Sequence, residues 1–196
     1  LLAHTIANIK QYFRSHPKAG YISLGVNDNH GHCVCSKCKA IDGDCINSVG
    51  EPDHSKTYYQ FVNKVAQEVG KEFPDKIFGL LAYSNVTDPP KGKLDDSVVP
   101  YLTYDRMKWV DKKIRRKRRD INLKWGKKVS AIGWYDYSGG KHYSLPRVYF
   151  HQTADYLKWG YNNNVKYYYT EAYPPAGAIE GPKLYLTLKL LWNPNA

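Results

Sequence analysis

Apolar residues along this chain form two kinds of pattern, and segments of the two kinds alternate. Spacings of three and four residues indicate amphipathic helices, whereas short continuous apolar runs indicate buried strands. The first helical pattern ends near His16-Pro17 and consists of Leu2, Ile6, Ile9 and Phe13. Helical spacing returns over residues 58–73, 109–126, 150–161 and 184–192. Ser55 is the expected N-cap of the second helix, and Pro74 follows its last turn.

Five apolar runs between these helices predict strands, over residues 21–27, 77–83, 98–104, 129–135 and 165–170. Strands that alternate with helices favour a parallel sheet whose connections are crossover helices. A doubly wound sheet and a (β/α)8 barrel both satisfy this order. No glycine-rich phosphate-binding fingerprint follows any of the strands, which argues against the dinucleotide-binding form of the doubly wound fold.

Polar groups stand at the end of each predicted strand, where the chain passes into a loop. The first strand runs into Asn27-Asp28-Asn29-His30. The later strands end in, or are followed by, Tyr83 with Asn85, Asp105, Asp136 and Glu171. A barrel delivers the C-terminal ends of all its parallel strands to one rim, where its catalytic groups lie. The pattern therefore predicts a functional site at such a rim.

Composition limits the class of protein without fixing its activity. The 196 residues are 42% hydrophobic with a mean hydropathy of -0.61, which suits one domain with a core. No apolar run approaches the roughly 18 residues needed to span a bilayer. The chain lacks an initiator Met and begins inside a helical pattern, so we interpret it as a fragment or a processed product. A missing signal peptide therefore says nothing about its compartment.

The net charge is +11, and much of the excess lies in the basic run of residues 112–119. A run of this density can bind phosphates or acidic polymers. The alternative is the solvated face of an amphipathic helix, because Ile114, Ile121 and Trp125 fall on helical spacing around it. We favour the solvated face. The 18 Tyr and 5 Trp suit stacking on sugars or bases as well as core packing.

Several motifs together resemble a bacterial family, the domain of unknown function 4838. They are the segment 22–29 with the spacing Cys33-x-Cys35-x-x-Cys38, Phe61-Val62-Asn63-x-Val65-Ala66, Phe73-Pro74-Asp75-Lys76, Leu81-Ala82-Tyr83, and the closing Leu188-Lys189-Leu190-Leu191-Trp192-Asn193-Pro194. These motifs cover nearly the whole chain, and the Asp-Asn pair with the cysteine spacing is the most specific of them.

The resemblance implies an α/β fold, a glycoside-hydrolase-like (β/α)8 barrel similar in plan to hexosaminidase and α-glucuronidase barrels. It also implies an extracellular or periplasmic protein of polysaccharide-degrading bacteria. A complete barrel takes about 250 residues, so about five βα units would form the C-terminal part of a TIM-type barrel. If 165–170 is the eighth strand, 21–27 is the fourth. The missing N-terminal part of the same barrel would then be a partner, and residues 1–196 alone would show weak activity or none.

Glycosidic cleavage usually needs two carboxyl groups. In the barrels that this family resembles, the acid ends the fourth strand, which is the place of Asp28. Asp28 is therefore the candidate general acid, or the group that orients a substrate N-acyl or hydroxyl, against a plain role as a loop cap. Glu171 is the preferred partner, as base, nucleophile or clamp on sugar hydroxyls, and Asp136 is the alternative. The candidates for substrate binding are Asn27, Asn29, His30, Tyr83, Asp105, Trp134, Tyr135 and Tyr173.

Four cysteines close to the Asp28 segment are expected to staple that loop. Secretion favours disulfides, and the two pairings left open are Cys33–Cys38 with Cys35–Cys45, and Cys33–Cys45 with Cys35–Cys38. A structural zinc ion is the rival, because clustered thiolates with histidines nearby suit a tetrahedral site. Free thiols are the third alternative. No other cofactor is expected.

Three functions remain open. The leading hypothesis is a carbohydrate-active enzyme domain, and the second is a carbohydrate-binding barrel without hydrolysis. The third is a nucleic-acid or polyanion binder, whose affinity would fall steeply with salt. We rank it last because the basic residues cluster on one predicted helix, which would lie on the outer ring of a barrel, away from the rim.

Overall fold

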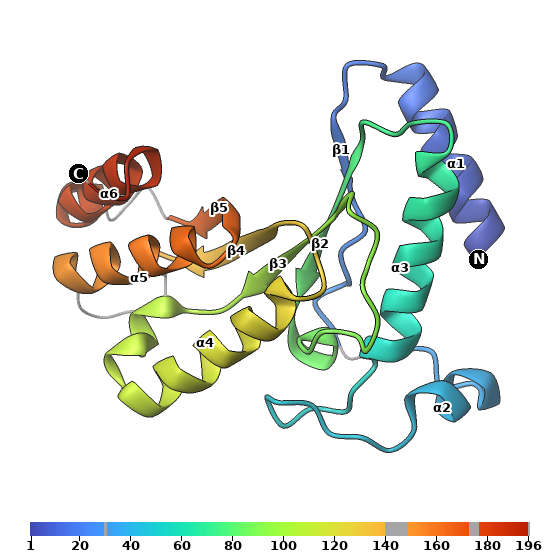
Figure 1. The fold of residues 1–196 in the computed structure, drawn as a ribbon, viewed down its shortest axis with the longest axis horizontal. Helices are drawn as coiled ribbons and strands as arrows, with labels where there is room; N and C mark the ends of the chain where they lie inside the picture. Colours follow the sequence, from blue (N-terminus) through green and yellow to red (C-terminus); the bar gives the residue numbers. More distant parts are fainter. Residues whose placement is uncertain (30, 140–148, 173–176, 196) are drawn as a thin grey trace.

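The computed structural model describes residues 1–29, 31–139, 149–172 and 177–195. Its strands form one five-stranded parallel sheet in chain order, and this sheet curls into a half-barrel (Figure 1). The strands are β1 (Tyr21–Ser23), β2 (Ile77–Ala82), β3 (Val98–Thr103), β4 (Ile132–Tyr137) and β5 (Val165–Glu171). The predicted fold class, an α/β partial barrel consistent with part of a TIM barrel, is confirmed.

Helices connect the strands and cover the outer side of the sheet. They are α1 (Leu2–Ser15), α2 (Ser36–Asp42), α3 (Ser55–Gly70), α4 (Lys112–Gly126), α5 (Phe150–Asn162) and α6 (Gly177–Trp192), with the short 3-10 helices η1 (Ser84–Val86) and η2 (Arg106–Val110). Helices α1 and α3 pack side by side, as do α5 and α6 (Figure 1). Among the helices of the described segments, none is long and apolar enough to cross a membrane.

Side chains along each strand alternate between the helices and the inner face of the half-barrel, as the two-residue period of a strand requires. On β2, Phe78, Leu80 and Ala82 are buried against the helices. On β4 the same face carries Ile132, Trp134 and Asp136. The inner face is rich in tyrosine and receives Tyr21, Tyr101, Tyr135, Tyr137, Tyr167 and Tyr169.

Two glycines allow close approaches that position this sheet. A Cβ atom on Gly133 of β4 would lie 2.6 Å from the ring of Tyr101, so the glycine makes room for that ring on the inner face. A Cβ atom on Gly160 of α5 would lie 2.5 Å from the ring of Trp134. The absence of a side chain there lets α5 pack directly on the indole that β4 presents.

Several predicted boundaries are wrong by a few residues. Helix α3 begins at Ser55 itself, so its N-cap is His54 rather than Ser55. The segment 109–126 divides into η2 and α4 because the side chain of Asp111 accepts hydrogen bonds from the backbone N–H groups of Lys113 and Ile114 and caps α4. The sequence pattern did not indicate α2. Strand β1 ends at Ser23, four residues before the predicted end.

Candidate functional site

The C-terminal ends of the strands surround a pocket of about 160 Å³. It is lined by Val26, Asp28, Leu81, Tyr83, Thr103, Tyr135, Tyr137 and Glu171. Asp28 follows β1 and Glu171 ends β5, which are the two outermost strands of the sheet. The curl of the half-barrel therefore brings carboxylates from both edges of the sheet to the same cavity.

Asp28 lies on a loop that local hydrogen bonds hold. The backbone N–H of Leu24 donates to the carbonyl of Gly79 at 2.7 Å, and the Tyr58 hydroxyl donates to the carbonyl of Leu24 at 2.6 Å. These contacts fix the end of β1 before the chain leaves the sheet. Beyond Asp28, the side chain of Asn29 accepts a hydrogen bond from the N–H of Gly31 at 2.8 Å and forms a local turn. Asp28 is an exposed residue, and it lines the pocket.

Glu171 is held by β4. The Tyr135 hydroxyl donates a hydrogen bond of 2.7 Å to Oε1 of Glu171. The carbonyl oxygen of Glu171 accepts from the N–H groups of Ser138 and Gly139, both at 3.1 Å, so the backbone at the end of β5 is also fixed. The ring of Tyr135 lies 4.8 Å from that of Tyr169, and this contact restricts its rotation. These hydrogen bonds hold Glu171 at its backbone carbonyl and at its side-chain Oε1.

The pocket tyrosines keep their protons beside these carboxylates. Burial, and after it the Asp28 carboxylate, raises the pKa of Tyr83. Burial and then the hydrogen-bonded Glu171 raise the pKa of Tyr135, and burial with the charge of Glu171 raises the pKa of Tyr137 to about 12. At neutral pH the pocket therefore combines two carboxylates with three phenolic O–H groups, and such a set suits a ligand rich in hydroxyls.

Trp134 is not part of this pocket, although it was predicted as a stacking surface. Its side chain projects from the face of β4 that packs against the helices, and it is buried. Its Nε1 donates to Oδ1 of Asn122 at 2.8 Å. Its ring lies parallel to that of Trp159 at 6.3 Å. The correction follows from the strand period: Tyr135 faces the pocket, so its neighbour Trp134 faces the core.

Asp136 lies on the same helix face and is not brought to the pocket either. Its Oδ1 accepts from the backbone N–H groups of Arg106 and Tyr137 at 3.0 and 2.9 Å. Its Oδ2 accepts from the hydroxyl of Tyr168 at 3.0 Å. The prediction of Asp136 as the second carboxylate of the site therefore disagrees with the structure, where it completes a buried network behind the sheet.

Three other candidates, Asp105, Asn27 and Asn29, do not line the pocket. Asp105 is buried and caps η2, since its side chain accepts a hydrogen bond of 3.1 Å from the N–H of Met107. Asn27 and Asn29 are exposed on the loop beside Asp28. His30 and Tyr173 lie outside the described residues.

Four lining residues were not among the predicted site residues, the apolar Val26 and Leu81 and the polar Thr103 and Tyr137. The two polar residues could have been found by alternation. Thr103 stands two positions after Tyr101 on β3, and Tyr137 stands two positions after Tyr135 on β4, so each shares the inner face with its partner.

The cysteines form a group beside the Asp28 loop. The sulfur atoms of Cys33, Cys35 and Cys38 all lie within 4.8 Å of one another, and this triad could hold a metal ion. All four cysteines are free thiols, and Cys45 is not part of the triad. A hydrogen bond from the Cys38 backbone, then the neighbouring thiols, lower the pKa of Cys35 to about 7. Hydrogen bonding with the thiol of Cys33 raises the pKa of Cys38 to about 12.

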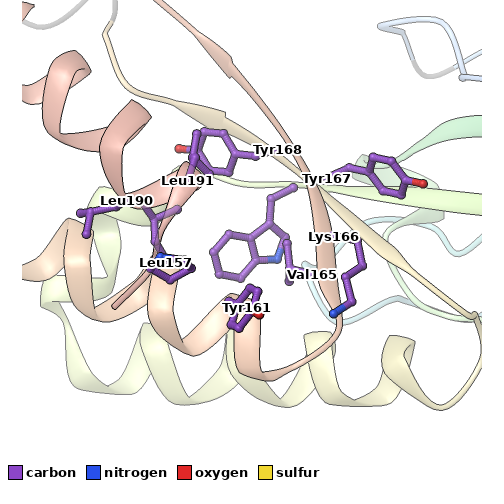
Figure 2. A pocket seen from close by; sticks show the side chains of 10 residues that line it. Leu157, Tyr161, Val165, Lys166, Tyr167, Tyr168, Leu190 and Leu191 are labelled. Carbon is purple, nitrogen blue, oxygen red and sulfur yellow. The ribbon is translucent and has the colours of Figure 1, made fainter. Parts of the chain in front are cut away.

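A second pocket, of about 180 Å³, lies between β5 and the helices α5 and α6 (Figure 2). Figure 2 shows Tyr168 turned toward Leu191 and Tyr167 pointing to the other side of the strand. Leu157, Val165 and Leu190 make the lining largely apolar, and it contains no carboxylate. Its chemistry does not match the predicted site, so we assign the site to the pocket between Asp28 and Glu171.

Comparison with known proteins gave one match. The model of the family described as a domain of unknown function (DUF4838) matches residues 1–196, the whole chain. Searches of curated proteins and of solved structures found no significant match. The family assignment therefore rests on the full-length match, and the chain belongs to the family of the domain of unknown function 4838.

Proposed function

We propose that this domain binds a glycan in the pocket between Asp28 and Glu171 and acts there as a glycoside hydrolase. The observation that carries the proposal is the lining of one small cavity by two carboxylates from opposite edges of the sheet. Two carboxyl groups on one site are the usual requirement of glycosidic cleavage. Asp28 is the proposed general acid, and Glu171 the clamp on sugar hydroxyls.

The contacts of the two carboxylates support this division of roles. Glu171 already accepts a hydrogen bond from the Tyr135 hydroxyl, and its backbone is fixed by β4. A carboxylate that is held in place suits acceptance of hydrogen bonds from sugar hydroxyls. Asp28 lines the pocket and is exposed, so a leaving-group oxygen of a bound glycan can approach it.

The size and surface of the pocket also support a sugar ligand. At about 160 Å³ it is smaller than the roughly 300–1,000 Å³ of pockets that enclose drug-sized ligands. We therefore propose that it takes one sugar ring of a longer chain. Tyr83, Tyr135 and Tyr137 combine ring faces with hydroxyl groups, and such amphipathic rings suit the apolar and polar faces of a pyranose.

The proposal is tested by measuring hydrolysis and binding of a panel of oligosaccharides and aryl glycosides by the full-length parent protein, because residues 1–196 alone are expected to show weak activity or none. Asp28→Asn keeps the shape of the side chain but removes its acid, so turnover should fall by about 100-fold or more while binding is kept. Asp44→Asn is the matched control, because Asp44 is an exposed carboxylate that does not line the pocket. It should leave both quantities unchanged.

The same experiment separates the alternatives. Glycan binding without turnover in the unmodified protein, weakened by Glu171→Gln, would identify a carbohydrate-binding domain without hydrolysis. If no glycan in the panel binds or reacts, the proposed function is wrong.

A further inference from the structure

Three thiols converge at one point of the loop between β1 and α2. Cys33 and Cys35 precede α2 in the chain, and Cys35 is the N-cap residue of that helix. Cys38 lies within α2, and the three sulfur atoms are all within 4.8 Å of one another. We propose that Cys33, Cys35 and Cys38 bind one zinc ion through three thiolates. This inference concerns a site outside the glycan pocket and does not depend on the proposed function.

The sulfur separations suit a shared ion better than a disulfide. A Zn–S bond of about 2.3 Å at tetrahedral angles places sulfur atoms about 3.8 Å apart. The observed triad needs to contract by about 1 Å or less to reach that arrangement. A disulfide would bring two sulfur atoms to about 2.05 Å and leave the third thiol without a role. A zinc ion uses all three.

Helix α2, which contains Cys38, is attached to the rest of the domain at its other end. At the far end of α2, the carboxylate of Asp42 is buried and joins the start of α3. Its Oδ1 accepts from the N–H of Thr57 at 2.9 Å, and its Oδ2 accepts from the Thr57 hydroxyl at 2.8 Å and from Nδ1 of His54 at 3.0 Å. Cys38 is four residues before Asp42 and therefore stands on the same face of an anchored helix. The ion would join two cysteines of a loop to one cysteine of that helix.

The coordination is three thiolates and one position filled by solvent. Cys33 and Cys35 are exposed, so water can reach the ion. Each thiol gives up its proton to solvent when it binds, and the bound zinc with three thiolates carries a net charge of -1. Cys45 is outside the triad and is not a ligand.

A filled site would restrain the Asp28 loop. The chain leaves β1 at Ser23 and reaches Cys33 ten residues later, with Asp28 between them. The first end of this segment is held by the sheet, and the ion would hold the second. Zinc binding should therefore protect residues 24–33 from proteolysis.

The test is metal binding under reducing conditions, measured with zinc and with cobalt as a spectroscopic probe. The unmodified protein should bind one ion per chain, and cobalt should give thiolate-to-metal charge-transfer absorption. Mutation of groups that only orient ligands already weakens metal sites by 10- to 100-fold. Cys33→Ser and Cys38→Ser remove a ligand and should therefore weaken binding by at least about 100-fold. Cys45→Ser is the matched control and should bind as the unmodified protein does.

Three results would overturn the proposal. The first is the absence of zinc binding and of cobalt–thiolate absorption in the reduced protein. The second is an equal loss of affinity from Cys45→Ser and Cys33→Ser. The third is a mass two units lower in the metal-free protein isolated without reductant, with a disulfide inside the triad and no zinc uptake after reduction. Circular dichroism of each variant, and zinc release from the unmodified protein by a chelator, separate a lost ligand from a misfolded chain.

Discussion

Tyr135 and Asp136 are neighbours on β4, but their side chains leave opposite faces of the sheet. Tyr135 donates to Glu171 in the pocket, whereas Asp136 lies behind the sheet with the buried guanidinium of Arg106. That guanidinium donates to the carbonyl oxygens of Leu102, Tyr104 and Tyr135 and stacks on a tryptophan ring at 4.0 Å. Burial lowers the pKa of Arg106, and the nearby Asp136 opposes that shift. The network stabilises the strand end from which Tyr135 reaches the pocket.

Replacement of Asp136 by Ala should destabilise the protein strongly. The change leaves the guanidinium of Arg106 buried without its counter-charge, and loss of one partner from a buried pair costs about 3–5 kcal/mol. The free energy of unfolding from urea titration measures this. Asp120→Ala is the control, because Asp120 pairs with Lys124 on the surface, where such pairs contribute at most about 1 kcal/mol. Equal effects of the two substitutions would contradict the structural role of Asp136.

Asp42 should make the stability depend on acid pH. Burial alone would raise its pKa, but hydrogen bonds from His54 and Thr57 outweigh burial and hold the pKa below the ordinary value of 3.8. A group with a lowered folded pKa binds protons more tightly when unfolded, so its contribution is present above pH 3.8 and is lost as the pH falls through the folded pKa. Asp42→Asn should remove this part of the pH dependence in urea titrations between pH 7 and pH 2. An unchanged pH profile would show that Asp42 is not the group responsible.

At the scale of elements, apolar periodicity predicted every strand and every long helix, because these elements bury a regular face. It did not indicate α2, which has seven residues and buries only Asp42. It also ended β4 too early, at 135, because Asp136 is polar and resembles a loop residue. In the structure β4 continues to Tyr137, paired with Glu171. A prediction that treats every polar residue as exposed cannot identify a buried polar network.

The basic helix α4 is a second case in which the sequence pattern does not show what the polar side chains contact. Arg118 lies over the ring of Tyr104 at 3.7 Å, and Arg119 lies over the ring of Trp159 at 4.8 Å. Two cations of the basic run therefore pack on aromatic rings of this domain. Four others, Lys112, Lys113, Arg116 and Lys117, are exposed. This arrangement favours the solvated face of an amphipathic helix over a dedicated polyanion site.

Helix α5 should tolerate no side chain at Gly160. A Cβ atom there would lie 2.5 Å from the ring of Trp134, so Gly160→Ala should force the two apart and destabilise the protein by about 1–3 kcal/mol. Gly70→Ala is the matched control in α3, where nothing lies within 4 Å of the added atom. It should be neutral or stabilising by up to about 1 kcal/mol, because alanine favours helix more than glycine. Thermal unfolding of both variants measures the difference, and a neutral Gly160→Ala would refute this packing.

At the scale of the whole molecule, the curl of the sheet decides which polar strand ends meet. The sequence showed that polar residues follow the strands, and Asp28 and Glu171 were both among the candidates. It could not show that the ends of β1 and β5 meet, because that depends on the order of the strands and the curl of the sheet. The strand order β1 to β5 and the register of each pair supply that information. Asp28 and Glu171 then line one pocket, while Trp134 and Asp136 turn away from it.

The central claim is that Asp28 and Glu171 act on the same bound sugar. A double-mutant cycle on kcat/KM, with Asp28→Asn, Glu171→Gln and the pair, tests it most directly. Residues that act on one substrate should be coupled by at least about 0.5 kcal/mol, whereas distant residues add within about 0.3–0.5 kcal/mol. We predict non-additive losses of kcat/KM. Strictly additive losses, or a kcat/KM that neither substitution changes, would contradict the account.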